Sequence, residues 1–118
     1  MQESKFTQKL MKALRAHPQL HSAVIFKHND RSTRGIPDFS ISIGVRTLWF
    51  EVKVNPNQLT KIQNYFIAKL NLGASVIYSS PSGQWAALIS PPMPIGTDIT
   101  YATFRGLVKE IVHRCINA

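Results

Sequence analysis

The chain has 118 residues, enough for one domain with a hydrophobic core, and 44% of them are hydrophobic. No apolar run approaches the roughly 20 residues of a membrane-spanning helix, and no signal-peptide pattern is present, so we expect no membrane partner. Fourteen Lys and Arg against six Asp and Glu give a formal charge of +8, which favours a polyanionic partner over a charge that serves solubility alone. The lone Cys115 excludes an internal disulfide and favours a reducing, cytoplasmic compartment.

The first part of the chain predicts a helix, a short strand and a basic loop. Residues 3–16 carry apolar side chains at helical spacing and predict an amphipathic helix that Pro18 ends. Residues 22–27 include an apolar run that predicts a strand, and residues 28–34 predict a polar, basic loop. In the helix, the apolar positions are Phe6, Leu10, Ala13 and Leu14, and the exposed basic positions are Lys5, Lys9, Lys12 and Arg15.

The next segment predicts a β-hairpin with charged side chains on one face. Glycine at position 44 suits the first central position of a two-residue type II′ turn. Antiparallel partners then sum to 89, so Asp38 faces Glu51, and alternation places Lys53 on the same face. A slip of one residue would put both acids in the core, so this register is strongly specified. The strands are residues 39–43 and 46–54, with Phe39, Ile41, Ile43, Leu48, Phe50, Val52 and Val54 on the core face.

The second half of the chain predicts a helix, two strands and a final helix. Thr60 and Gln63 have the spacing of a capping box at a helix start. The strand after this helix is expected to lie parallel to its predecessor because a helix connects them. The order α-β-β-β-α-β-β-α predicts an α/β fold with a mixed sheet flanked by helices. The predicted elements are a helix at 60–71 with Ile62, Phe66 and Leu70 inward, strands at 74–79 and 85–90, an extended connector at 91–94, and a helix at 101–116 with Phe104, Leu107, Val108, Ile111 and Val112 inward.

Asp38, Glu51 and Lys53 are the residues best suited to chemistry. Directly opposed strand residues lie about 4.5–5.5 Å apart at Cβ, and two carboxylates at that separation repel unless a cation lies between them. Such oxygen ligands suit Mg²⁺ or Mn²⁺, and Lys53 can orient an attacking water and stabilise a phosphorane-like transition state. Ordinary explanations remain open, since Asp38 follows a proline in a turn-like pair and Lys53 can simply form an ion pair with Glu51.

With these residues in place, the chain resembles the PD-(D/E)xK nuclease superfamily, and within it the small stand-alone VRR-Nuc domains of phages and bacteria. The resemblance depends on Gly-Ile-Pro-Asp at 35–38, Glu-Val-Lys at 51–53, Glu3 in the first helix and Gln63 in the helix after the hairpin. It covers about residues 3–80, and the residues after about 90 carry no motif of the family. The resemblance implies a restriction-endonuclease-like fold for a single domain at 1–118.

The resemblance also implies roles for residues that spacing alone does not assign. Glu3 and the Val52 carbonyl would join Asp38 and Glu51 as metal ligands, and Gln63 would lie near the catalytic lysine. Each outer residue has another explanation: an acid in a first helical turn is favoured by the helix dipole, and the capping box by itself accounts for Gln63.

The function that the resemblance implies is a Mg²⁺- or Mn²⁺-dependent endonuclease that leaves 5′-phosphate and 3′-hydroxyl ends. Its expected substrate is branched DNA such as a Holliday junction, and symmetric cutting of two strands would need a homodimer. Three alternatives stay open: a less structure-selective duplex DNA nuclease, an RNA-processing enzyme on the same scaffold, and a non-catalytic nucleic-acid-binding domain.

Basic residues near the motif are candidates for phosphate contacts, with a merely solvated loop as the alternative. These candidate nucleic-acid-binding residues are His28, Arg31, Arg34 and Lys61. Trp49 falls on the same face as Asp38 and Glu51, where we expect it to pack in the protein rather than stack on a base.

Overall fold

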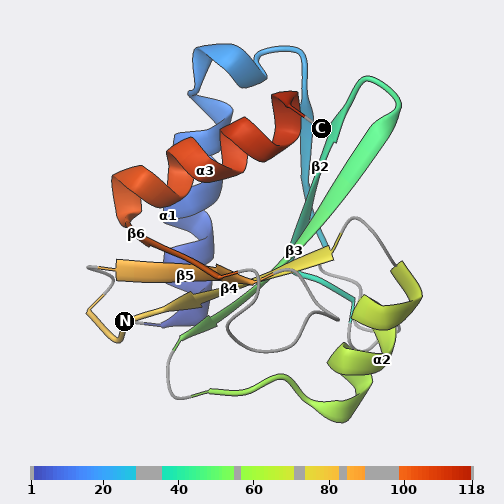
Figure 1. Ribbon diagram of the computed structural model, residues 1–118, viewed down its shortest axis with the longest axis vertical. Helices are drawn as coiled ribbons and strands as arrows, with labels where there is room; N and C mark the ends of the chain where they lie inside the picture. The colour runs from blue at the N-terminus through green and yellow to red at the C-terminus, as the bar shows by residue number, and fades with distance from the viewer. Residues whose placement is uncertain are drawn as a thin grey trace.

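The computed structural model describes residues 2–28, 36–54, 57–70, 74–82, 85–89 and 99–117. Over these residues, one sheet of six strands runs in chain order from β1 to β6, with helices on both faces (Figure 1). The mixed α/β architecture predicted from the sequence is therefore confirmed. The elements are α1 (Glu3–Arg15), the 3₁₀ turn η1 (Pro18–Leu20), β1 (Val24–Lys27), β2 (Phe39–Ile43), β3 (Arg46–Val54), α2 (Lys61–Leu70), β4 (Ala74–Ser79), β5 (Trp85–Ile89), β6 (Ile99–Thr103) and α3 (Phe104–Ile116).

The β2–β3 hairpin has the predicted strands and register. Phe39 pairs with Phe50 and Ile43 with Arg46, so partners sum to 89 as expected. Gly44 opens the turn with a φ of 60°, a left-handed conformation that glycine adopts without steric cost. The register places Phe39, Phe50 and the other alternating apolar residues on one face and leaves the charged residues on the other.

The strand that follows α2 is parallel to its predecessor, as predicted. Trp49 of β3 pairs with Ala74 of β4, and the ladder continues to the pairing of Val54 with Ser79. All other neighbouring strands among the described residues are antiparallel. A parallel pair needs a crossover connection, and α2 provides it on the face opposite α1 and α3 (Figure 1).

The predicted start of the last helix is wrong, and a strand was missed. Residues 99–103 form β6, which pairs with β5, and α3 begins only at Phe104. Thr103 ends the strand and caps the helix, because its Oγ1 accepts a hydrogen bond from the amide of Gly106 at 3.1 Å. The β-branched residues Ile99, Thr100 and Thr103 favour extended backbone, whereas the inward helical pattern starts at Phe104. The predicted connector at 91–94 lies outside the described residues.

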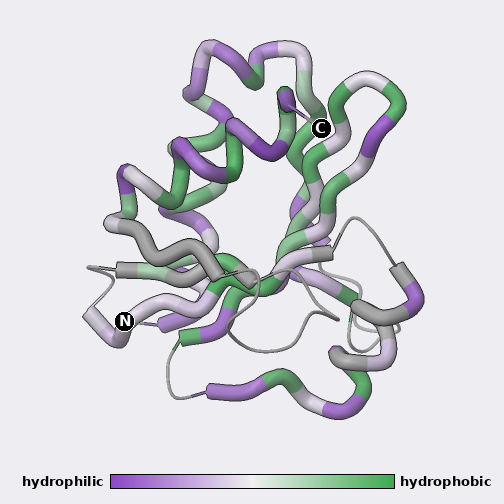
Figure 2. Tube along the Cα trace, in the orientation of Figure 1, coloured by the Kyte–Doolittle hydropathy of each residue, from purple (hydrophilic) through white to green (hydrophobic). Residues whose placement is uncertain are grey.

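The main core lies between the sheet and the two helices α1 and α3. Green and purple segments alternate along both helices, as their amphipathic sequences require (Figure 2). The predicted inward residues of α1 are buried or half-buried, and its predicted basic positions are exposed. Phe104 and Val108 of α3 pack at the core margin. The largest fully buried side chains of this core are Phe6, Leu10, Leu14, Phe39, Ile41, Phe50, Val52, Ile77, Leu88, Leu107 and Ile111.

The predicted inward stripe of α2 is wrong at Ile62, which is 43% exposed. Gln63, one position later, instead directs its side chain towards Glu51 on the sheet. Since successive helical residues are separated by about 100° around the axis, turning Gln63 inward rotates Ile62 to the solvent. The side chains of Phe66 and Leu70 lie outside the described set.

Within the described part of the chain, no helix combines the length and apolar character that a membrane crossing requires.

Candidate functional site

Glu51 and Lys53 lie at the end of β3, on the sheet face that carries α2. Both are buried, with 3% and 8% of their surfaces exposed, and Lys53 Nζ lies 3.9 Å from Glu51 Oε2. The alternating residues Phe50 and Val52 point the other way, into the main core. Two ionisable residues are thus held on one side of the end of β3, and the side chains on its opposite side there are apolar.

Asp38 lies beside them because it comes directly before β2. The amide of Val52 donates a hydrogen bond to Asp38 Oδ2 at 2.8 Å. This amide lies beyond the ladder, since β2 begins at Phe39 and Phe39 pairs with Phe50. The carboxylate therefore satisfies a backbone donor that the neighbouring strand does not reach. Continuation of the same register places Asp38 opposite Glu51, as the sequence predicts.

Glu3 reaches the same end of β3 from the first turn of α1. Its Oε2 accepts hydrogen bonds from the amide of Val54 at 3.2 Å and from Asn57 Nδ2 at 2.6 Å. The contact with Val54 brings together residues 51 positions apart in the chain. Glu3 therefore satisfies the next free amide of β3, and its charge contributes to the electrostatics of Asp38 and Glu51.

Gln63 combines the two explanations that the sequence left open. Thr60 and Gln63 form the predicted capping box: Gln63 Oε1 accepts from the amide of Thr60 at 2.9 Å, and Thr60 Oγ1 accepts from the amide of Gln63 at 3.2 Å. The other end of the same amide group, Nε2, donates to Glu51 Oε2 at 3.2 Å. The start of α2 thereby fixes one oxygen of the buried carboxylate.

The electrostatics of the acid pair favour a proton or a cation. Burial, followed by the charge of Asp38, raises the pKa of Glu51 to about 8, although Lys53 acts in the opposite direction. Burial also raises the pKa of Asp38, against the hydrogen bond from the Val52 amide. Two carboxylates in contact, one of them buried, cannot both ionise cheaply in the absence of a cation. At neutral pH the pair therefore holds a proton that a bound cation would displace.

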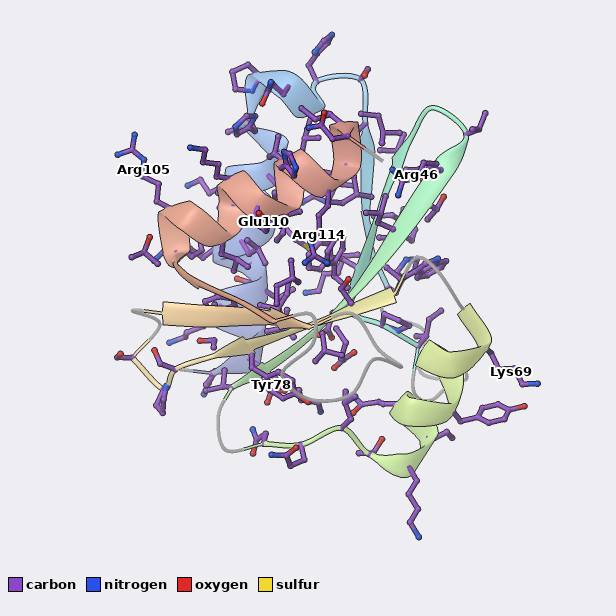
Figure 3. The ribbon with its side chains drawn as sticks, viewed as in Figure 1. Arg46, Lys69, Tyr78, Arg105, Glu110 and Arg114 are labelled. Atoms are coloured by element: carbon purple, nitrogen blue, oxygen red, sulfur yellow. The ribbon has the colours of Figure 1, made fainter. Side chains whose placement is uncertain are left out.

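Tyr78 is a neighbour of the site that sequence reasoning missed. It pairs with Lys53 in the parallel β3–β4 ladder and projects from the sheet on the side of α2 (Figure 3). Burial and the charge of Glu51 raise the pKa of its phenol, so the hydroxyl stays protonated at neutral pH. Alternation places Tyr78 on a face, but only the parallel register places it beside Lys53, and that register depends on how α2 crosses over.

An opening of about 360 Å³ borders the acidic end of the site. Glu3 and Asp38 form part of its wall, together with Lys27 at the end of β1. A basic residue in the wall favours the approach of an anionic group such as phosphate. The remaining wall residues are Ser4 and Thr7.

The structure describes two of the four residues predicted to contact phosphate, His28 and Lys61. His28 Nε2 hydrogen-bonds Ser40 Oγ at 2.9 Å, and burial lowers the pKa of its imidazole. Lys61 is exposed at the start of α2. Arg31 and Arg34 lie outside the described residues.

The fold shows where two further side chains near the motif, those of Trp49 and Arg46, make their contacts. Trp49 packs against Val76, so the expected packing role is confirmed. Arg46 is basic and close in sequence, but its Nη1 donates to the carbonyl of Arg114 near the end of α3. Figure 3 shows Arg46 and Arg114 on the opposite side of the sheet from Tyr78, so Arg46 is not part of the site.

The oxygen atoms near Asp38 and Glu51 are of the kind that could hold a hard cation. Asp38 and Glu51 supply two carboxylates, and the carbonyl of Val52 is the predicted third oxygen. No group of three His, Cys, Asp or Glu side chains able to hold a metal occurs in the described ranges, so Glu3 is not brought into a three-acid cluster. Burial raises the pKa values of Asp38 and Glu51, and the charge of Asp38 raises that of Glu51 further; a divalent cation would offset both effects.

Comparison of the chain with protein-family models and with curated protein sequences finds no match. The likeness to VRR-Nuc domains therefore stays a prediction from the motif residues. Assignment of a function depends on the geometry and the electrostatics of Asp38, Glu51 and Lys53.

Proposed function

We propose that the chain is a Mg²⁺- or Mn²⁺-dependent endonuclease of the PD-(D/E)xK type, with a restriction-endonuclease-like fold, that hydrolyses phosphodiester bonds in DNA. One observation carries the proposal: Asp38, Glu51 and Lys53 lie together on a sheet face, and the pKa of Glu51 is raised to about 8. Asp38 and Glu51 would repel phosphate when no cation is present, which disfavours a domain that only binds nucleic acid.

Asp38, Glu51 and the Val52 carbonyl would hold the cation. Bound there, a divalent ion would polarise the phosphate and lower the pKa of a water ligand. Gln63 would keep Glu51 Oε2 oriented through the 3.2 Å hydrogen bond that it already makes. Glu3 would hold the end of β3 in place and add negative charge beside the pair.

Lys53 would supply the positive charge of the protein itself. Its ammonium lies 3.9 Å from Glu51 Oε2 and only 8% of the residue is exposed. A buried ammonium interacts more strongly with developing charge than an exposed one, because the effective dielectric constant is lower. Lys53 would therefore orient the attacking water and stabilise the pentavalent phosphorus of the transition state.

Within this proposal, the preferred substrate is branched DNA, and a homodimer cuts it. One chain carries one such site, and paired cuts across a junction need two sites related by a two-fold axis. The net charge of +8 supports binding to a polyanion. Less selective duplex cleavage is the alternative within the same chemistry.

A non-catalytic nucleic-acid-binding domain is the second candidate, and one observation favours it. Asp38 and Glu3 already satisfy the amides of Val52 and Val54, so both acids have a structural use without any metal. Lys53 and Glu51 would then be a buried ion pair of the same strand.

A cleavage assay separates these functions. The protein is incubated with a four-way junction, a flap, a matched linear duplex and a single strand, each with Mg²⁺, Mn²⁺ or EDTA. We expect metal-dependent cutting that is strongest on branched DNA, and a loss of more than about 100-fold in Asp38→Asn, Glu51→Gln and Lys53→Met. Glu110→Gln is the matched control, since Glu110 is an acid paired with Arg114 on α3, across the sheet.

Cutting that persists in EDTA, or full activity in the Asp38 and Glu51 variants, would contradict the proposed chemistry. Tight binding to every substrate without any cutting would favour the binding domain. Equal cutting of the junction and of the matched duplex would leave the nuclease but reject its preference for branched DNA.

A further inference from the structure

Three aromatic rings lie in contact on the sheet face that carries the acidic site. The ring centroids of Phe26 and His28 are 5.1 Å apart, and those of His28 and Trp49 are 4.8 Å apart. The second pair is stacked, with planes inclined by 26°. His28 is held in this position because its Nε2 hydrogen-bonds Ser40 Oγ at 2.9 Å. We call Phe26, His28 and Trp49 the ring row.

The strand registers place the ring row next to the acids. Phe26 pairs with Ser40, and Ser40 pairs with Trp49, so these residues share one face of three strands. Trp49 precedes Glu51 by two residues on β3 and therefore points to the same side. The amide of His28 donates to the carbonyl of Asp38 at 2.8 Å, so the residue that carries the central ring is the cross-strand neighbour of Asp38.

The outer end of the ring row is open to solvent. Phe26 is 59% exposed, and Val24, two residues earlier on β1, is 62% exposed. The helix on this face, α2, packs on β4. Hydroxyls border the apolar surface, since Ser42 Oγ and Thr47 Oγ1 form a 2.9 Å hydrogen bond there. An exposed phenylalanine at the end of a stack, with polar neighbours, has the composition of a binding surface.

We propose that the ring row is a stacking platform for an unpaired nucleobase on the strand whose phosphate enters the acidic site. This inference rests on the proposed nuclease function and deepens it, because it names what distinguishes the preferred DNA. Branch points and single-stranded ends present unstacked bases, whereas a matched duplex does not. Stacking of one base on an aromatic side chain contributes about 1–3 kcal/mol and tolerates any sequence.

Charge and chemistry favour a nucleotide over a second copy of the chain as the occupant. The protein carries a formal charge of +8, which attracts a nucleic-acid strand but gives a second copy of the chain no such attraction. Lys27 is exposed next to Phe26 and lines the opening beside Asp38, where it can meet the backbone phosphate.

Binding measurements in EDTA test the platform apart from catalysis. Fluorescent single strand, junction with unpaired bases and blunt duplex are titrated with wild type, Phe26→Ala, Phe26→Leu and Phe26→Tyr. We expect Phe26→Ala and Phe26→Leu to weaken binding of the first two by about tenfold and of the duplex by less than twofold. Phe26→Tyr should retain binding, and Val45→Ala is the control, since Val45 is fully exposed at the hairpin turn.

The fluorescence of Trp49 provides a second measurement of DNA binding. Trp85→Phe leaves Trp49 as the single tryptophan of the chain, and single-stranded DNA should quench its emission in that background. Phe26→Ala should shift the quenching to higher DNA concentration by the same tenfold factor. The slope of affinity against salt concentration should stay unchanged, because the ring contributes no phosphate contact.

Three results would overturn the platform: equal loss of affinity for duplex and single strand in Phe26→Ala, full binding in Phe26→Leu, or conversion of a dimer to a monomer by Phe26→Ala in sedimentation. The last result would make the surface a subunit interface. If the protein cuts no substrate but Phe26→Ala still loses single strands selectively, the nuclease fails and the platform stands. If cutting occurs and binding is indifferent to Phe26, the platform fails and the nuclease stands.

Discussion

The two faces of the sheet are made by the same strands but bury different kinds of side chain. On the face covered by α1 and α3, Phe39, Phe50 and Val52 are completely buried among apolar neighbours. On the other face, the intervening positions carry the buried ionisable side chains of Glu51 and Lys53, and the described residues include a small apolar cluster around Val76. The main core lies on one face, and the buried ionisable residues lie on the other.

The difference shows how a small sheet can hold buried charge. Burying a carboxylate against apolar side chains is strongly unfavourable unless it is hydrogen-bonded or paired. β3 can bury Glu51 because its other face packs in the main core and because Gln63 and Lys53 contact Glu51 directly. Substitutions on the α1/α3 face should therefore lower the stability of the fold, and substitutions on the other face should lower the proposed cleavage activity.

The largest expected effect is on stability, from the α1/α3 face. Phe50→Ala should lower the free energy of unfolding by about 3–5 kcal/mol, because it opens a cavity beside the stacked ring of Phe39. Phe26→Ala, on the other face and 59% exposed, should change it by less than about 1 kcal/mol. Urea unfolding followed by circular dichroism measures both, and comparable losses would contradict the separation of the two faces.

The next effect is a pH dependence that comes from Glu51. Folding raises the pKa of Glu51 from 4.5 to about 8, so the folded protein keeps a proton that the unfolded chain releases across this interval. In EDTA, the free energy of unfolding of the wild type should therefore fall as the pH rises from about 5 to about 8.

Glu51→Gln should remove this contribution and exceed the wild type by on the order of 2 kcal/mol at pH 8. Denaturant titrations at several pH values measure the difference, and Glu110→Gln should follow the wild type. Equal pH profiles for Glu51→Gln and the wild type would show that the acid is not buried in the way described.

Gln63 should show an intermediate effect in which its two roles separate. Gln63→Ala removes the cap on the Thr60 amide and the donor to Glu51, so it should cost about 1 kcal/mol of stability and about tenfold in cleavage. Thr60→Ala removes the acceptor for the Gln63 amide but keeps the donor to Glu51, so it should lower stability and not cleavage. Thermal melting and initial cleavage rates measure the two, with the exposed Gln58→Ala as control.

The smallest expected effect concerns Tyr78. Tyr78→Phe removes one neutral hydroxyl beside Lys53 and Glu51, and should reduce cleavage by a factor of about 2–10 with little change in the melting temperature. Tyr65→Phe, on the exposed side of α2, should leave the initial cleavage rate unchanged. Identical rates for the two variants would exclude Tyr78 from the site.

The elements that the sequence predicted well are those with a local pattern. The hairpin follows from period-two alternation on both sides of Gly44, and one turn then determines every pair, including the approach of Asp38 to Glu51. The capping box of Thr60 and Gln63 is equally local. β6 was missed because its residues run directly into α3 with no turn between them, and Thr103 both ends the strand and caps the helix.

The sequence identified candidate site residues in distant segments but could not predict where they lie in the fold. Glu3 binds the end of β3 across 51 positions, and nothing local in α1 specifies which strand its first turn reaches. The inward turn of Gln63, at the expense of Ile62, likewise depends on where α2 lies against the sheet.

By itself, the sequence determined the face of β3 on which Glu51 and Lys53 lie, and the residue opposite Glu51, because side-chain alternation and a two-residue turn are properties of adjacent residues. Only the tertiary structure decided what surrounds them. Tyr78 lies beside Lys53 because α2 sets the parallel register, and the ring row forms because β1 pairs with β2 and brings Phe26 and His28 to Trp49. Those contacts follow from packing between segments, which no local pattern encodes.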